Sequence, residues 1–478
     1  MGAGKVFKKF PKTFWVANSI ELFERWAWYG FFMLFANYLT GSSDMGGLEL
    51  SQAEKGHIMG IGTAFLYFLP VLTGSIADKI GYKKMLFISF VIYTTAFIAL
   101  PMFDSFWGVF AIYLYLALGA ALFKPVISAT IAKTTTEETS SIGFGIFYMM
   151  VNIGAFIGPL VTLLFKDNSY DFVFYISAGV VAFNFILLFF YKEPERVVTR
   201  ESLGTSIKNI FINIGEVLKD KKFVIFLFIV AGFWTMYNQL FFTLPVFIAQ
   251  WVDTSVIFDF FHQYLPFFSE NYGTVDGQMQ SEFITNADAM FIILLQIVVS
   301  SFVMRYKPLK AMTAGFLVCS IGMALTLVTQ NVMFTLVAIL IFALGEMAGS
   351  PKINEYIGRI APANKKALYM GYSFLPVFLG NLFAGFISGG VYENLSDKNN
   401  FVKQEVAKRG LDISETLSQN DYFNTAATEM GMNSRELTNY LWDTYNPSNM
   451  WYVVISIGLV SVLALYLYDR FLMTDRKK

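Results

Sequence analysis

The chain has 478 residues, of which 55% are hydrophobic and only 15% are charged, and its formal net charge at pH 7 is zero. An ordinary soluble domain carries about 25% charged residues, so this composition excludes a typical soluble protein, and the balanced charge argues against a nucleic-acid partner. The single cysteine, Cys319, excludes a disulfide framework.

The apolar residues fall in long blocks of about 16–29 residues, enough to cross the roughly 30 Å hydrocarbon core of a bilayer as helices. We therefore predict an all-α membrane protein with twelve spanning helices. They cover approximately residues 15–39, 56–77, 85–101, 106–132, 142–165, 173–191, 223–251, 289–304, 312–328, 333–360, 368–391 and 450–468. The first block is too long for the apolar region of a signal peptide, so we expect it to be retained.

Lysine and arginine are distributed unevenly between the two sides of this arrangement. Of the 35 such residues, 25 fall on the side of the N-terminus when Arg359, at the very end of its predicted span, is counted with the loop that follows; 7 fall on the opposite side and 3 within predicted spans. Loops rich in lysine and arginine stay on the cytoplasmic side of a membrane. We therefore expect a multi-pass protein of the cell (inner or plasma) membrane with both termini in the cytoplasm.

A polar stretch after the sixth span divides the chain into two halves. The predicted parts are a six-helix N-terminal bundle, a cytoplasmic linker, and a six-helix C-terminal bundle with two non-cytoplasmic insertions: residues 1–192, 193–222, and 223–478 with 252–288 and 392–449. In the second insertion, Asn433 and Glu436 form a capping-box pattern before an apolar helix face. We therefore expect this insertion to form a small helical cap.

The first predicted span contains three ionisable residues, Glu21, Glu24 and Arg25. Residues three and four apart are neighbours on a helix, so these side chains share one face with Trp28. Ionisable groups are costly in hydrocarbon, and they must therefore face the bundle interior or a watery cavity. A charged and aromatic face of this kind is typical of a transport pathway, although a purely structural ion pair remains the alternative.

The loop between the second and third spans reads Gly74-Ser75-Ile76-Ala77-Asp78-Lys79-Ile80-Gly81-Tyr82-Lys83-Lys84. Its glycines permit a tight turn and close helix approach, and Asp78 can pair with basic groups or cap a helix end. The loop resembles the signature loop of the major facilitator superfamily. The resemblance implies the major facilitator superfamily fold, with twelve helices in two six-helix halves, and a gating role for Asp78.

A narrower resemblance rests on motifs in both halves. The longer motifs are Glu21-x-x-Glu24-Arg25-Trp26-x-Trp28-Tyr29-Gly30 in span one and Phe147-Tyr148-Met149-Met150-Val151-Asn152-Ile153-Gly154-Ala155-Phe156 in span five. The shorter ones, in spans two, four and ten, are Tyr67-Phe68-Leu69-Pro70, Phe123-Lys124-Pro125, and Gly345-Glu346 with Ser350-Pro351. Together they resemble the signatures of the proton-dependent oligopeptide transporters. This resemblance implies import of di- or tripeptides by proton symport through alternating access; we expect a monomer in the lipid bilayer, without a cofactor.

The charged candidates divide naturally into substrate and proton sites. If Glu21, Glu24, Arg25, Lys124 and Glu346 share one cavity, three acids and two bases leave a net charge of −1, which a proton or a substrate cation would neutralise. A zwitterionic peptide would place its amino group at Glu346 and its carboxylate at Arg25 and Lys124, as the resemblance also implies. A proton on Glu21 or Glu24 would free a base for the substrate carboxylate.

Further candidates are polar or aromatic residues of the same motifs. The expected substrate contacts are Tyr29, Tyr67, Tyr148, Asn152, Trp234 and Asn238, with Phe233 as a further pocket wall. Any one aromatic residue is more often core packing in a chain with 52 phenylalanines and 25 tyrosines. Lys352 and Glu355, three residues apart near the cytoplasmic end of span ten, are expected to pair with each other and are gate candidates with Asp78.

Span seven departs from the family pattern. Many members have a carboxylate where Asn238 stands, paired with the lysine of span four, so Lys124 needs another partner and we expect Glu21 or Glu24. The departure leaves open a major facilitator carrier of a non-peptide solute (a drug, nitrate or conjugate) or an uncoupled carrier. A peptide-binding membrane sensor is a minor alternative. No nucleophile elbow, Walker loop, zinc spacing or dinucleotide fingerprint occurs at a credible place, so we expect neither an enzyme nor a metal site.

Overall fold

The computed structural model of the chain describes residues 9–136, 139–166, 169–195, 204–205, 208, 212, 215–216, 218–362 and 366–473. The predicted linker, residues 193–222, lies mostly outside the described residues. Throughout the described part the regular structure is helical, and strand pairing is confined to isolated bridges. The prediction of an all-α protein is therefore confirmed.

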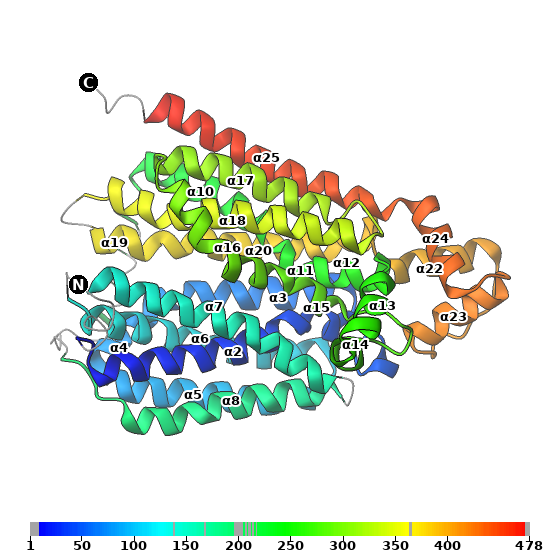
Figure 1. Cartoon of the computed structure of the whole chain (residues 1–478), viewed down its shortest axis with the longest axis horizontal. Helices are drawn as coiled ribbons and strands as arrows, with labels where there is room; N and C mark the ends of the chain where they lie inside the picture. The colour runs from blue at the N-terminus through cyan, green and yellow to red at the C-terminus, as the bar shows by residue number, and fades with distance from the viewer. Residues whose placement is uncertain are drawn as a thin grey trace.

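The N-terminal half is a layer of long helices. Their bounds are α2 Lys12–Thr40, α3 Gln52–Phe68, α4 Pro70–Ile80, α5 Tyr82–Ala99, α6 Phe106–Lys133, α7 Ser140–Lys166 and α8 Tyr170–Phe190. Figure 1 shows them in the lower layer, from blue to blue-green. A capping box of Ser51 and Glu54 starts α3. Gly81 turns the chain between α4 and α5 with a φ of 108°, which glycine adopts most readily, as the loop motif predicts.

The C-terminal half forms the upper layer of Figure 1. The helices of its bundle are α10 Lys221–Tyr237, α11 Gln239–Phe242, α12 Leu244–Trp251, α15 Ser281–Thr285, α16 Ala287–Val303, α17 Pro308–Leu325, α18 Val332–Ile360, α19 Lys366–Gly371, α20 Leu375–Phe386 and α25 Met450–Leu467. Predicted span seven is broken into α10, α11 and α12. Its last break coincides with Pro245, which lacks a backbone N–H and sits in the first turn of α12.

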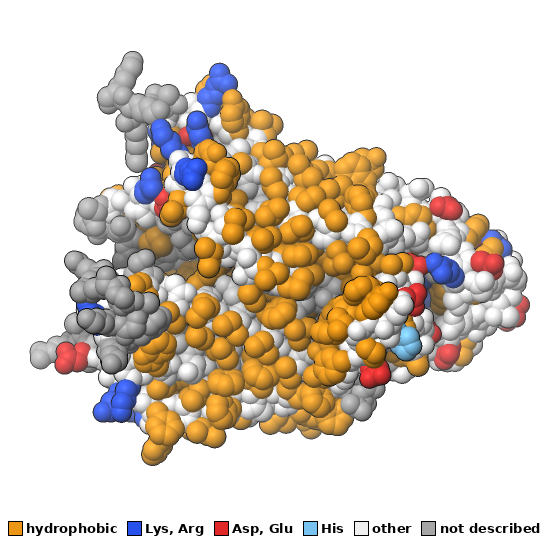
Figure 2. Space-filling model, in the orientation of Figure 1, with side chains coloured by type: hydrophobic (Ala, Val, Ile, Leu, Met, Phe, Trp, Pro, Cys, Tyr) orange, Lys and Arg blue, Asp and Glu red, His pale blue; other side chains and the backbone are white. Residues whose placement is uncertain are grey.

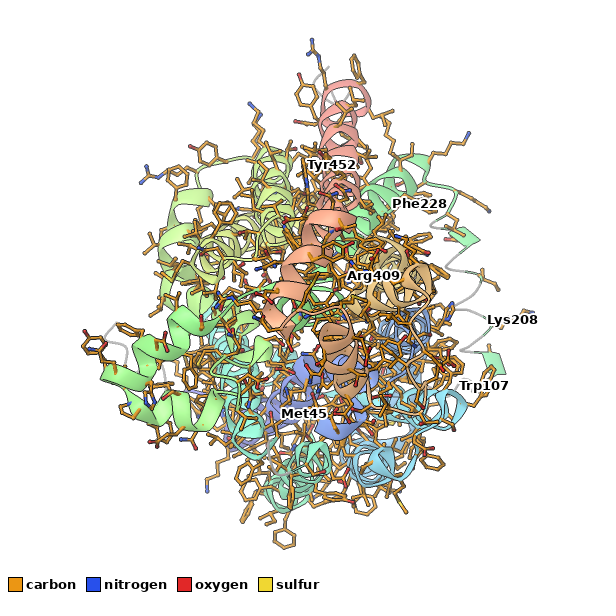
Figure 3. The ribbon with its side chains drawn as sticks, turned by 90° about the vertical axis from the view of Figure 1, so that its right-hand side faces the viewer. Met45, Trp107, Lys208, Phe228, Arg409 and Tyr452 are labelled. Carbon is orange, nitrogen blue, oxygen red and sulfur yellow. The ribbon has the colours of Figure 1, made fainter. Side chains whose placement is uncertain are left out.

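The two insertions lie together at one end of the molecule, at the right of Figure 1. They contain α13 Ser255–Tyr264 and α14 Pro266–Tyr272, then α21 Tyr392–Leu395, α22 Lys398–Arg409, α23 Gln419–Glu429 and α24 Ser434–Tyr445. Asn433 and Glu436 form the predicted capping box at the start of α24, and Arg435 makes an ion pair with Asp253 of the first insertion. Figure 3 looks onto this capped end, with Arg409 of α22 near the middle of the view and Trp107 at its edge.

Eleven helical segments of the described chain are long and apolar enough to cross a membrane. α2 is not among them, because Glu21, Glu24 and Arg25 lower its hydropathy, although it has 29 residues. With α2 the described helices supply the twelve predicted spans. Figure 2 shows the matching surface: hydrophobic side chains cover the middle of the visible face, and charged side chains gather toward its ends. α2 begins and α25 ends at the end opposite the cap (Figure 1).

Glycines bring α2 and α7 into close contact. A side chain at Gly154 would meet the carbonyl oxygen of Leu22 at 2.6 Å and Cβ of Arg25 at 2.8 Å. Gly30 and Gly158 make a similar approach, with Gly158 lying against the backbone of Trp26. The backbone of α7 therefore lies directly against the charged segment of α2, and no residue larger than glycine fits at these positions.

Candidate functional site

The charged face of α2 lies in the bundle interior, as predicted. Arg25 donates two hydrogen bonds to Glu24, from Nε at 2.5 Å and from Nη2 at 2.6 Å, and its Nε is 3.5 Å from Oε1 of Glu21. The Tyr93 hydroxyl of α5 donates to the same Glu24 carboxylate at 2.5 Å. Glu24 has no exposed surface. The Glu24 carboxylate is therefore compensated by one guanidinium and one hydroxyl donor.

Lys124 of α6 does not pair as predicted. Among the described residues it makes no ion pair with Glu21 or Glu24; its ammonium lies over the ring of Tyr67, 5.0 Å from the centroid. Glu24 is already occupied by Arg25 and Tyr93. Lys124 still interacts electrostatically with Glu21. It remains a half-buried cation without a carboxylate partner within the described chain.

The facing half contributes acids. The Tyr237 hydroxyl of α10 donates to Oε1 of Glu346 on α18 at 2.8 Å. Oε2 of Glu346 and Oδ1 of Asp288, on α16, are buried and have no hydrogen-bond partner among the described residues. Sequence reasoning missed Asp288 because it placed this residue last in the 252–288 insertion. The available signal was an acid one helical turn before the apolar residue Ile292.

Tyrosines connect the two sets of charges. Tyr29 of α2 interacts electrostatically with groups from both halves: Arg25, Tyr67, Tyr148 and Glu346. Tyr148 of α7 interacts in the same way with Glu346 and Asp288, and Arg25 lies 5.8 Å from the Tyr29 ring centroid. The structure therefore brings the predicted charged residues and all three predicted tyrosines together between the halves.

The remaining predicted contact residues have different surroundings. The Asn152 amide donates to the carbonyl of Tyr148 in its own helix at 2.8 Å. Trp234 packs edge-on against Tyr237, with 4.9 Å between ring centroids. Asn238 is buried, and its Nδ2 has no partner among the described residues. Phe233 corrects the prediction of a pocket wall: it is fully buried and stacks on Phe316 at 3.7 Å, so it packs the core of the C-terminal half.

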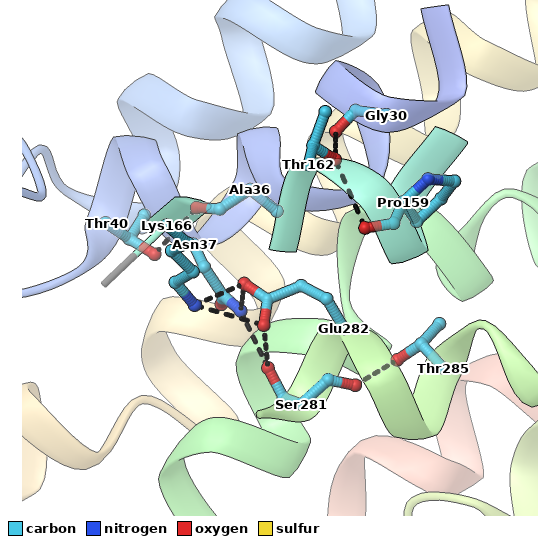
Figure 4. Close-up of polar contacts among 10 residues, drawn as sticks. All are labelled: Gly30, Ala36, Asn37, Thr40, Pro159, Thr162, Lys166, Ser281, Glu282 and Thr285. Carbon is cyan, nitrogen blue, oxygen red and sulfur yellow. Dashed lines mark hydrogen bonds and ion pairs between the residues drawn. The ribbon is translucent and has the colours of Figure 1, made fainter. Parts of the chain in front are cut away.

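A buried polar cluster joins the two halves near the capped end (Figure 4). Nζ of Lys166, at the end of α7, lies 2.9 Å from Oε1 of Glu282 in α15. The Asn37 amide of α2 donates to the same oxygen at 2.9 Å and to Ser281 Oγ at 2.8 Å. None of these residues was a candidate, because their contact depends on how the halves pack.

Other contacts also join the two halves near the capped end. Lys55 was predicted to lie in a loop, but the capping box starts α3 earlier and places Lys55 in its first turn, fully buried. Its ammonium donates to the carbonyl of Phe242 in the other half at 2.9 Å. The backbones of Gly56 and Gly385 also touch. In the cap, the N–H of Gln419, the first residue of α23, donates to Glu49 at 2.8 Å.

The gate candidates lie toward the end opposite the cap. Asp78 accepts a hydrogen bond from the Tyr82 hydroxyl at 3.0 Å. Lys352 and Glu355 form the predicted ion pair, with 2.7 Å between Nζ and Oε2, and Arg359 binds the other oxygen of Glu355. Within the described residues, no cluster of three or more His, Cys, Asp or Glu side chains is arranged to hold a metal ion.

Known proteins resemble this chain in sequence. A family model described as Major Facilitator Superfamily matches residues 19–385. The Na(+), Li(+), K(+)/H(+) antiporter of Planococcus maritimus is 23% identical over 70% of this chain and 81% of its own length. Multidrug resistance protein MdtH of Aeromonas salmonicida is 23% identical over 69% and 76%. Dipeptide and tripeptide permease A of Proteus mirabilis is 28% identical, over 35% of each chain.

Solved structures share the whole fold. A peptide transporter POT mutant in complex with alafosfalin superposes with a TM-score of 0.69 at 16% identity, covering 96% of this chain and 95% of the other. A POT family transporter in complex with 5-aminolevulinic acid gives a TM-score of 0.68 at 17% identity, covering 96% and 97%. At this identity the likeness establishes the arrangement of the helices.

Proposed function

The chain belongs to the Major Facilitator Superfamily, and from that premise we propose that it imports di- or tripeptides by proton symport through alternating access. The observation that carries the proposal is the separation of charge across the site. Arg25 and Lys124 come from the N-terminal half, and Glu346 from the C-terminal half, with Tyr29 in electrostatic contact with both sides. This arrangement fits a small zwitterion that bridges the two halves.

In this proposal each end of the peptide meets a group of opposite charge. The carboxylate binds the guanidinium of Arg25 and the ammonium of Lys124, because charge-assisted hydrogen bonds are the strong ones. Lys124 has no carboxylate partner among the described residues and is therefore available. The α-amino group binds the Glu346 oxygen that the Tyr237 hydroxyl leaves unpaired. The remaining substrate contacts are made by the side chains of Tyr29, Tyr67, Tyr148, Asn152, Trp234 and Asn238.

Proton coupling follows from competition for Arg25. When Glu21 and Glu24 are ionised, Arg25 is held by both. A proton on either acid weakens that hold and releases the guanidinium toward the substrate carboxylate. Loss of the proton on the cytoplasmic side restores the internal pair and expels the peptide. Proton and peptide therefore travel in the same direction.

Alternating access requires one end of the pathway to close at a time. The contacts around Glu282 and Lys55 hold the halves together at the capped end, which supports a state closed to the non-cytoplasmic side. In this proposal Asp78, Lys352 and Glu355, which lie toward the opposite end, act as gates; their local contacts support that role. We place both termini in the cytoplasm and the protein, as a monomer, in the cell membrane, because 25 of the 35 lysine and arginine residues lie on the terminal side.

Uptake of labelled di-alanine into proteoliposomes tests this proposal. Accumulation that depends on an imposed inward proton gradient, and that disappears when the gradient is collapsed, is the expected result. Accumulation that is unchanged after the collapse would overturn proton symport and leave peptide transport standing.

A carrier of a non-peptide solute is the second candidate. It is favoured by Asn238, which stands where many peptide transporters have a carboxylate, and by the similarity of the chain to a cation/proton antiporter and to a multidrug resistance protein. Counterflow separates the two: liposomes loaded with di-alanine exchange it for labelled di-alanine only if the peptide is a substrate. Failure of that exchange, with active exchange of a cationic drug such as ethidium, would favour the second candidate.

A further inference from the structure

Two carboxylates, Asp288 on α16 and Glu346 on α18, lie near the contact between these helices in the C-terminal half. Ile292 of α16 packs with Ala343 and Met347 of α18 in a small apolar cluster. Asp288 lies one helical turn before Ile292, and Glu346 lies between Ala343 and Met347 along the helix, so both acids lie beside this contact. An electrostatic interaction between Asp288 and Glu346 agrees with that placement.

Asp288 is buried and Glu346 is half-buried, and each has one buried carboxylate oxygen without a partner among the described residues. Asp288 is only 6% exposed, and neither its Oδ1 nor Oε2 of Glu346 has a hydrogen-bond partner among the described residues. A buried polar atom without a partner is costly, and a buried charge without a counter-charge is more so. These two oxygens therefore call for a donor that the described part of the chain does not supply.

The described side chains that interact with both carboxylates are uncharged. Tyr148 of α7, Tyr237 of α10 and Cys319 of α17 interact electrostatically with both carboxylates. By contrast, Glu282 at the start of the same span is bound by Lys166, and Glu24 is bound by Arg25. Asp288 and Glu346 are thus acids of the site for which the described residues provide no cation.

We infer that Asp288 and Glu346 form a two-carboxylate site that binds ammonium groups of the substrate and selects peptides with a cationic side chain. This inference rests on the proposed function and narrows its substrate class. When Asp288 is counted, the net charge of the fully ionised site becomes −2 and not −1. The site then holds four acids (Glu21, Glu24, Glu346, Asp288) and two bases (Arg25, Lys124). A zwitterionic peptide leaves that charge unchanged, whereas a lysine-containing dipeptide adds a second ammonium to it.

The expected preference order follows from charge alone. A dipeptide with two ammonium groups satisfies both carboxylates, and a neutral side chain leaves one of them to be neutralised by a proton. An acidic side chain brings a third negative charge next to the pair and is rejected, because like charges at close range repel strongly in a dry site. Asp288 therefore acts as a specificity-determining residue.

Competition in proteoliposomes measures this preference. The measured quantity is the concentration of Lys-Ala, Ala-Ala or Asp-Ala that halves the uptake of labelled di-alanine. It is compared between the wild type, Asp288→Asn and the control variant Asp171→Asn, since Asp171 lies exposed at the start of α8. In the wild type and in Asp171→Asn we expect Lys-Ala to compete at least about tenfold better than Asp-Ala, and Asp288→Asn to lose most of that ratio. Asp288→Glu, which keeps the charge, restores it. An equal ratio in the wild type and in Asp288→Asn would overturn the inference.

A direct binding measurement tests the two-carboxylate site independently of peptide transport. Purified protein is titrated calorimetrically with cadaverine, a diamine whose two ammonium groups match the two carboxylates. Binding that weakens at least about tenfold in Asp288→Asn supports the site even if di-alanine is not taken up, an outcome that would overturn only the proposed function. No cadaverine binding to the monodisperse wild-type protein would overturn the two-carboxylate site.

Discussion

Lys166 and Glu282 form an ion pair across the interface between the two halves, with 2.9 Å between Nζ and Oε1. The Glu282 side chain is fully buried, and the lysine side chain is 17% exposed. Breaking a buried pair by removing one partner typically costs about 3–5 kcal/mol, because the other charge stays buried without compensation. The pair therefore makes the closed capped end sensitive to single substitutions.

Lys166→Met is expected to destabilise the closed capped end by about 3 kcal/mol or more. Spin labels at residues 45 and 412, in a chain with Cys319→Ser, report the distance across this end; we expect a longer and broader distribution in the variant. Lys408→Met is the matched control, because the Lys408 side chain is 58% exposed and Glu405 keeps Arg409, Tyr440 and Tyr445 as partners, so no buried charge is left unpaired. An unchanged distribution in Lys166→Met would show that this pair does not hold the halves together.

The glycine contact between α2 and α7 predicts a steric effect. Gly158→Ala places a methyl group against the backbone of Trp26 and Gly30, and overpacking of this kind typically costs about 1–3 kcal/mol. We expect a lower melting temperature and reduced uptake, since the shift displaces Arg25. Gly179→Ala in α8, which meets nothing within 4 Å, should be neutral or slightly stabilising. Equal melting temperatures for the two variants would contradict the tight α2–α7 contact.

The hydrogen bond between the Gln419 N–H and Glu49 predicts how the stability of the contact at the capped end depends on pH. Burial raises the pKa of this carboxyl, but hydrogen bonds from the N–H groups of Ser43 and Gln419 outweigh it and hold the pKa below its ordinary value of 4.5. A carboxyl with a lowered pKa stabilises the contact fully above the ordinary pKa and loses that contribution as pH falls through the lowered value. The contact should therefore stay formed between about pH 8 and pH 5.

The same spin-label pair measures this dependence. The distance across the capped end should be constant from about pH 8 to about pH 5 and lengthen only in stronger acid. In Glu49→Gln the acid-induced change should become smaller, and Asp44, a second carboxylate that accepts hydrogen bonds from Asn420 at the same contact, accounts for what remains. A transition near neutral pH that disappears in Glu49→Gln would mean that this carboxyl senses protons during transport, contrary to its environment.

The sequence predicts the features that depend on local spacing. Helical neighbours three and four apart place Glu21, Glu24 and Arg25 on one inward face, and the Lys352–Glu355 pair and the Asn433 capping box follow from the same kind of rule. These features need only the geometry of one helix. They are confirmed without knowledge of how the helices pack.

Features that depend on packing between helices were missed. Tyr93 is 69 residues from Glu24, and Glu282 is 116 residues from Lys166, so spacing could not connect them. Asp288 and Lys55 were placed in loops because the apolar blocks were taken to start later than the helices do. The ion pair expected between Lys124 and Glu21 or Glu24 is not formed among the described residues: Arg25 and Tyr93 already satisfy Glu24, and Lys124 interacts with Glu21 only electrostatically.

The most direct test of the account is peptide-driven proton movement. Proteoliposomes with a pH-sensitive dye inside receive di-alanine outside, with the Glu24→Gln variant and peptide-free buffer as controls. We predict internal acidification that requires the peptide in the wild type and is absent from Glu24→Gln, because this variant cannot release and recapture Arg25 through a proton. No acidification by folded wild-type protein, or equal acidification in Glu24→Gln, would contradict coupling through the charged face of α2.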